Sequence, residues 1–124
     1  MQKLIDANVI LRYLLRDNDE MSQRAKTIIE AGAFTLPEII AEVVYVLKGV
    51  YSVPRDEIAD TLIQFLGLVG MENKEVVVTA LFLYGKQNLD FVDCILLARH
   101  RLLGETVATF DKKLVNYPPL RRKP

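Results

Sequence analysis

The feature that most constrains the fold is an alternation of short apolar runs with longer segments whose apolar residues recur at helical spacing. The runs at residues 3–5, 75–79 and 106–110 are typical of single buried strands. Between them the spacing predicts amphipathic helices at residues 8–16, 20–31, 37–48, 54–66, 79–86 and 90–103. Strands separated by helices pair in parallel, and the helices cover both faces of the sheet. We therefore predict a helix-rich, three-layer α/β fold with a short central parallel sheet.

Length and charge distribution indicate one domain followed by a distinct tail. A chain of 124 residues corresponds to about one domain, and it contains no repeat and no Ser/Gly-rich linker. The 16 basic and 16 acidic residues cancel, but Arg121, Arg122 and Lys123 stand together at the end. Without these three, 13 basic residues face 16 acidic ones, so the body carries a charge of −3. We assign residues 1–117 to the domain and residues 118–124 to a basic C-terminal tail.

The rarest residue types exclude several classes of site. Cys94 is the only cysteine and His100 the only histidine, which excludes an internal disulfide, a cysteine-rich zinc site and a two-histidine zinc protease helix. Neither serine lies in a nucleophile-elbow pattern. No apolar run approaches the ~18 residues of a membrane span, and the start lacks the pattern of a signal peptide. A lone thiol then fits a cytoplasmic protein that does not enter the membrane.

Carboxylates are plentiful, and four of them occupy positions suited to a common site. Asp6 directly follows the first predicted strand and Asp111 follows the last, and ligands of open parallel sheets bind beyond the carboxyl ends of strands. Glu42 falls within the third predicted helix, and Asp93 falls within the helix that follows Asp90. An oxygen-rich set of this kind favours Mg²⁺ or Mn²⁺, which would bridge the acids to a phosphate and ionise a bound water.

Each of these carboxylates also has a purely structural interpretation. Asp6 and Asp111 are suited to cap the helices that follow them. Glu42 lies opposite the apolar stripe of its helix, which is typical of a solvated face. Asp93 has mostly apolar neighbours in the sequence, and a buried carboxylate needs a partner charge or a metal. Asp93 also shares one helix face with Asp90, and this face fits the solvent-exposed side of the helix equally well. The residues alone leave these alternatives open.

Taken together, four segments resemble the PIN domain, and more narrowly the small VapC-type toxins of toxin–antitoxin systems. They lie at residues 4–10, 42–47, 90–98 and 107–111, and in this order they extend over nearly the whole chain. The resemblance implies a metal-dependent ribonuclease in which magnesium or manganese is held by a cluster of acids. The implied catalytic and metal-binding residues are Asp6, Glu42, Asp93 and Asp111. The implied supporting polar residues are Asn8, Asp90 and Thr109.

The resemblance also implies partners, namely an RNA substrate, an antitoxin protein and a second copy of the chain in a homodimer. Two features depart from the family pattern. Ala7 stands where relatives often have threonine, which removes one hydroxyl contact. The chain ends in Tyr117, two prolines and the basic tail, where relatives commonly add a last apolar strand. The second departure concerns the edge of the sheet and not the acid cluster.

Two other functions compete with the nuclease. A catalytically silent PIN-like interaction module would bind a partner protein or RNA, using the apolar faces of the second to fourth helices. Metal-dependent cleavage after removal of any partner discriminates between this module and the enzyme. A phosphoryl-accepting receiver also gathers acids at strand ends, but the long helical stretch from residue 8 to about residue 70 disagrees with its regular alternation of strands and helices.

Overall fold

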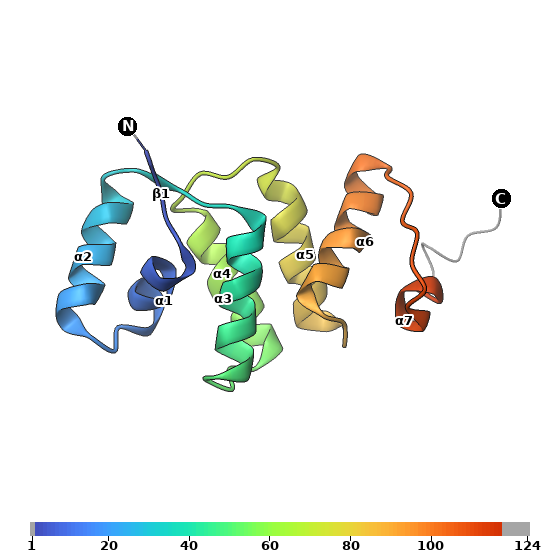
Figure 1. Cartoon of the computed structure of the whole chain (residues 1–124), viewed down its shortest axis with the longest axis horizontal. Coiled ribbons are helices and arrows are strands. Elements are labelled where there is room, and N and C mark those ends of the chain that lie inside the picture. Colours follow the sequence, from blue (N-terminus) through green and yellow to red (C-terminus); the bar gives the residue numbers. More distant parts are fainter. Residues whose placement is uncertain (1, 118–124) are drawn as a thin grey trace.

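The structure is a computed structural model that describes residues 2–117. Two short strands and seven helices follow one another within these residues (Figure 1). Their order and bounds are β1 (Lys3–Leu4), α1 (Ala7–Leu15), α2 (Asp19–Glu30), β2 (Ala33–Phe34), α3 (Pro37–Gly49), α4 (Arg55–Leu66), α5 (Lys74–Lys86), α6 (Phe91–Leu103) and α7 (Lys112–Val115). The predicted helix-rich α/β class is therefore confirmed. Across the described part of the chain, no helix is long and apolar enough to span a membrane.

The sheet is short and parallel, as the sequence predicts. Lys3 lies opposite Ala33 and Leu4 opposite Phe34, and α1 and α2 form the connection between the two strands. A further bridge joins Phe34 to Gly70, so an extended segment lies on the other side of β2. This arrangement leaves one edge of β1 without a neighbouring strand among the described residues.

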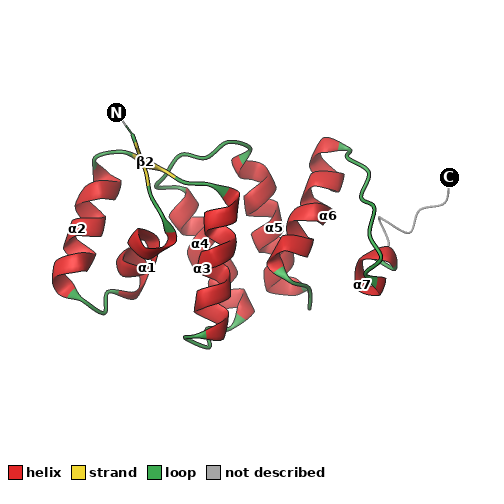
Figure 2. Ribbon diagram, viewed as in Figure 1, coloured by secondary structure: helices red, strands yellow, loops and turns green. Residues whose placement is uncertain are grey.

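Helix packing provides most of the core. α5 packs between α4 and α6, and the helices stand side by side from α2 at one end of the molecule to α7 at the other (Figure 2). The side of α5 that faces the interior includes Val77, Ala80 and Leu81, all of them fully buried. The predicted helix at residues 90–103 matches α6, which ends at Gly104 in a left-handed conformation with a φ of 71°.

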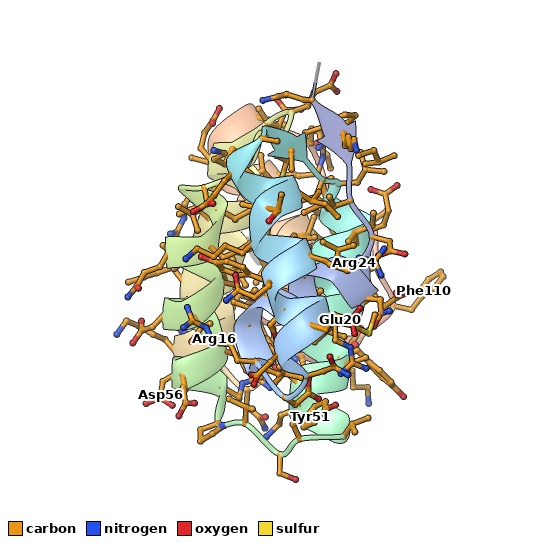
Figure 3. All side chains as sticks on the ribbon, turned by 90° about the vertical axis from the view of Figure 1, so that its left-hand side faces the viewer. Arg16, Glu20, Arg24, Tyr51, Asp56 and Phe110 are labelled. Carbon is orange, nitrogen blue, oxygen red and sulfur yellow. The ribbon has the colours of Figure 1, made fainter. Side chains whose placement is uncertain are left out.

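Two predicted strands are wrong. Residues 75–79 lie inside α5, because the buried pairs Val76–Val77 and Ala80–Leu81 recur at helical spacing and face the core. Packing there outweighs the strand preference of the valines. Residues 106–110 form no strand, and the side chain of Phe110 is fully exposed and points away from the helices (Figure 3). The basic tail at residues 118–124 lies outside the described residues, and the proposed domain boundary stays a prediction.

Candidate functional site

Asp6 stands at the end of β1, where two contacts hold the backbone just before it. The N–H of Ile5 donates to the carbonyl of Phe34 at 2.9 Å, and the buried hydroxyl of Thr35 donates to the carbonyl of Ile5 at 3.2 Å. The Asp6 side chain caps α1, because its Oδ1 accepts the N–H of Val9 at 3.0 Å. The predicted cap is confirmed. The cap uses only Oδ1 of this exposed side chain.

Glu42 and Asn8 are both exposed on the helices that carry them. Glu42 lies on α3 beside the fully buried Val43, so the predicted solvated face is confirmed. Asn8 lies in the first turn of α1, two residues after Asp6. α3 packs against α1 on one side and against α6, the helix that carries Asp93, on another.

Asp93 lies in an environment that disfavours its charged form. It is half-buried in the first turn of α6, and this burial raises its pKa. The negative charges of Asp111 and Asp90 raise the pKa further, while Lys113 lowers it. The charged side chains at the start of α7 therefore lie close enough to the start of α6 to act on Asp93. Lys113 Nζ also reaches the carbonyl of Asn88 at 3.5 Å, in the loop that precedes α6.

Asp111 is held by its own local contacts. Its Oδ1 accepts the N–H of Lys113 at 2.9 Å, which confirms the predicted cap of α7. Thr109 supports the same turn, since its hydroxyl oxygen accepts the N–H of Asp111 at 3.0 Å. Thr109 was singled out by the family resemblance, and this contact explains how it positions the backbone of Asp111.

The four predicted site residues are not assembled into a metal-binding cluster. Asp93 and Asp111 are close enough to influence each other, whereas Asp6 stands beside β1 and Glu42 lies on α3, which packs against both α1 and α6. β1 and α7 lie toward opposite ends of the row of helices (Figure 1). Within residues 2–117, no three His, Cys, Asp or Glu side chains gather closely enough to hold a metal ion. Carboxylate oxygens are suitable ligands for a hard cation, but these four side chains do not lie close enough together to coordinate one ion.

Arg55 is a positioning residue that the sequence analysis missed. It opens α4, and its Nε donates to the carbonyl of Tyr84 at 3.0 Å while its Nη2 donates to the carbonyl of Leu89. The guanidinium carbon also lies 3.8 Å from the centroid of the Tyr84 ring. Arg55 thereby joins the end of α5 to the residue just before Asp90. Its partners are 29 and 34 positions away, so no local pattern could have revealed this role.

Replacing Arg55 with methionine should lower the free energy of unfolding by about 1.5–3 kcal/mol, because two carbonyls lose a charged donor. Arg55→Lys should recover little of this stability, since one ammonium group does not reproduce the forked guanidinium geometry. Urea denaturation checks both variants. Arg24→Met, on the exposed surface of α2, is the matched control and should change stability little. Equal stabilities of Arg55→Met and the wild type would show that these contacts do not hold the loop.

Cys94 and His100 do not offer reactive groups to this site. Cys94 is fully buried, and burial raises the pKa of its thiol to about 12. The thiolate that would act as a nucleophile or metal ligand is therefore not formed near neutral pH. His100 Nδ1 lies 2.9 Å from the carbonyl oxygen of Glu105, so this nitrogen carries the proton and serves the turn after α6.

Comparison with known proteins identifies the family. The sequence model of the PIN domain matches residues 3–118, and the chain therefore belongs to the PIN domain family. It is also similar to a protein named VapC ribonuclease from Aquifex aeolicus (strain VF5). The two are 27% identical over 124 residues, which cover 90% of this chain and 88% of that protein. No solved structure matches the chain. The resemblance drawn from the four sequence segments is confirmed.

Proposed function

We propose that this protein is a divalent-metal-dependent ribonuclease that hydrolyses RNA phosphodiester bonds. The observation that carries the proposal is the environment of Asp93, a half-buried carboxylate whose pKa is raised by burial and by the charges of Asp111 and Asp90. Carboxylates held together in this way repel one another, and a divalent cation would relieve the repulsion. Membership of the PIN domain family and the similarity to a protein named VapC ribonuclease support the same function.

The proposed ligands of Mg²⁺ or Mn²⁺ are the four acids named from the sequence, Asp6, Glu42, Asp93 and Asp111. The proposal requires Asp6 and Glu42 to approach Asp93 and Asp111 when metal binds, because the described residues do not bring three of them together. A bound ion of this kind activates water and stabilises charge on the phosphate. Asn8, Asp90 and Thr109 are proposed to support the ligands, Thr109 through its hydrogen bond to the Asp111 backbone.

The proposed biological setting is a toxin–antitoxin pair in the cytoplasm. The supporting observation is the similarity to the VapC ribonuclease, which covers most of both chains. In this setting the protein would be a toxin that cleaves RNA until an antitoxin protein binds it, and it would form a homodimer. Analytical ultracentrifugation of the protein alone and together with the product of the adjacent reading frame measures both associations.

Metal removal provides the direct test of the proposed enzyme. Labelled single-stranded RNA should be cleaved by the purified, partner-free protein with Mg²⁺ or Mn²⁺, and cleavage should fall to background after addition of a chelator. Excess Mn²⁺ should restore the rate, because the same folded protein regains its ion. A gel-based time course measures the initial rates, and circular dichroism verifies that the chelator leaves the helices intact.

The competing function is the catalytically silent interaction module. It is favoured by the observation that the described residues hold no assembled metal cluster. Cleavage that persists in chelator would contradict the metal site, whereas absence of cleavage under every metal condition, together with tight partner binding, would establish the module instead.

A further inference from the structure

A groove of about 480 Å³ lies between α3 and the start of α6. Its apolar wall includes Val44, Phe91 and Val92, and Asp93 lines the same groove. Ligand pockets in proteins commonly enclose about 300–1,000 Å³, so the groove has the dimensions of a site for a small organic group. The carboxylate proposed to act in catalysis therefore faces an open, largely apolar space.

Tyr45 projects into solvent at the α3 side of this groove. Its side chain is 78% exposed, although a ring of this size is usually at least partly buried in a core or an interface. Aromatic side chains that stand free beside a groove are the platforms on which unpaired bases stack, and one such contact contributes about 1–3 kcal/mol to binding.

Lys48 lies on the same face of α3, three residues after Tyr45. Side chains at this spacing are neighbours on a helix surface. Lys48 is exposed, and across residues 2–117 its ammonium group takes part in no salt bridge or side-chain hydrogen bond. Arg55 also lines the groove, but its guanidinium already binds two carbonyls. Lys48 is therefore the free cation of this groove.

We propose that the groove is a subsite for one nucleotide of single-stranded RNA, with the base stacked on Tyr45 and a neighbouring phosphate bound by Lys48. The inference rests on the proposed ribonuclease function and names how that enzyme holds its substrate. Lys48 and the exposed ring of Tyr45 on the α3 side complement a phosphate and a base, and the phosphate would bind on this side because Asp90 and Asp93 line the α6 side of the groove. Paired bases keep their faces stacked within the duplex, so the subsite selects unpaired RNA.

Binding of a short fluorescein-labelled oligouridylate to a non-cleaving Asp6→Asn background tests the subsite. Adding Tyr45→Ala should weaken binding about 10-fold, equivalent to ~1.4 kcal/mol, whereas Tyr45→Trp should preserve it. Adding Lys48→Gln should reduce the slope of log affinity against log salt by about 0.7, the value for one phosphate contact on single-stranded nucleic acid. Fluorescence anisotropy over a salt series measures both effects.

The chain supplies a matched control on α5. Phe82 is 52% exposed, and its ring centroid lies 5.1 Å from the ammonium group of Lys86. This pair reproduces the exposed aromatic and lysine outside the groove, so Phe82→Ala and Lys86→Gln should leave affinity and salt slope unchanged. In a second readout, an oligouridylate that contains 5-iodouridine should crosslink to the peptide that carries Tyr45.

Equal weakening by Phe82→Ala and Tyr45→Ala would overturn the subsite, because binding would then be nonspecific. It would also be overturned if Tyr45→Ala dissociated an oligomer without changing RNA affinity, since the groove would then be a protein interface. The outcomes separate the two proposals. Metal-dependent cleavage that is indifferent to Tyr45 removes the subsite alone, whereas Tyr45-dependent binding without cleavage under any metal condition removes the ribonuclease.

Discussion

Replacing Asp6 with asparagine should reduce metal-dependent RNA cleavage by at least about 100-fold while the free energy of unfolding stays nearly unchanged. The two effects separate because asparagine is as good a helix cap as aspartate. Its side-chain oxygen can accept the same N–H of Val9 that Asp6 Oδ1 accepts at 3.0 Å. The substitution removes only the negative charge, which is what a divalent cation requires of a ligand.

Two further variants, Asp6→Ala and Asp56→Asn, separate the loss of the charge from the loss of the helix cap. Asp6→Ala should lose activity and also about 1 kcal/mol of stability, because the cap is lost with the charge. Asp56→Asn is the matched control, since exposed Asp56 also accepts a nearby backbone N–H, that of Glu57, at 2.9 Å. It lies on α4, which carries none of the four proposed metal ligands, and should retain wild-type activity. Initial cleavage rates and urea denaturation measure the two quantities. Wild-type cleavage by Asp6→Asn would remove Asp6 from the metal site.

Asp93→Asn should change activity and stability in opposite directions. Cleavage should fall by at least about 100-fold, because a proposed metal ligand loses its charge. The metal-free protein should nevertheless unfold at a higher urea concentration at neutral pH. Burial and the charges of Asp111 and Asp90 disfavour the ionised Asp93 side chain, and a neutral amide does not experience that repulsion.

The stability difference should depend on pH in a defined direction. The pKa of Asp93 is raised above its ordinary value of 3.8, so the folded protein binds this proton more tightly than the unfolded chain does. Below pH 3.8 the carboxyl is protonated in both states, and the wild type carries no penalty from this group. As the pH rises through the raised pKa of the folded state, the wild type loses stability relative to Asp93→Asn.

Urea denaturation of the metal-free protein at several pH values measures this curve. Asp60→Asn, at an exposed position on α4, is the control, and its stability difference from the wild type should be small at every pH. A decrease in stability for Asp93→Asn at neutral pH would contradict the description of Asp93 as a repelled, half-buried carboxylate. Unchanged activity of the same variant would remove it from the catalytic site without affecting the stability argument.

The sequence predicted local features well because their causes are local. The caps at Asp6 and Asp111 each depend on a hydrogen bond that spans two or three residues, and Gly104 ends α6 through its own backbone geometry. Features that need a distant neighbour were less predictable. Strand β2 was missed because two residues carry too little periodicity, and residues 106–110 have strand-like composition without a strand beside them.

By itself the sequence determined which chemistry is present: many carboxylates, one thiol, one histidine, and four segments arranged as in the PIN domain family. Only the tertiary structure decided which of these groups influence one another. It brings the charge of Asp111 close to Asp93, gathers no three of the four acids into a metal site among the described residues, and places Arg55 and Tyr45 around the groove beside Asp93. The physical reason is distance: burial, electrostatic repulsion and hydrogen bonding act through space between helices, whereas sequence patterns record only neighbours along the chain.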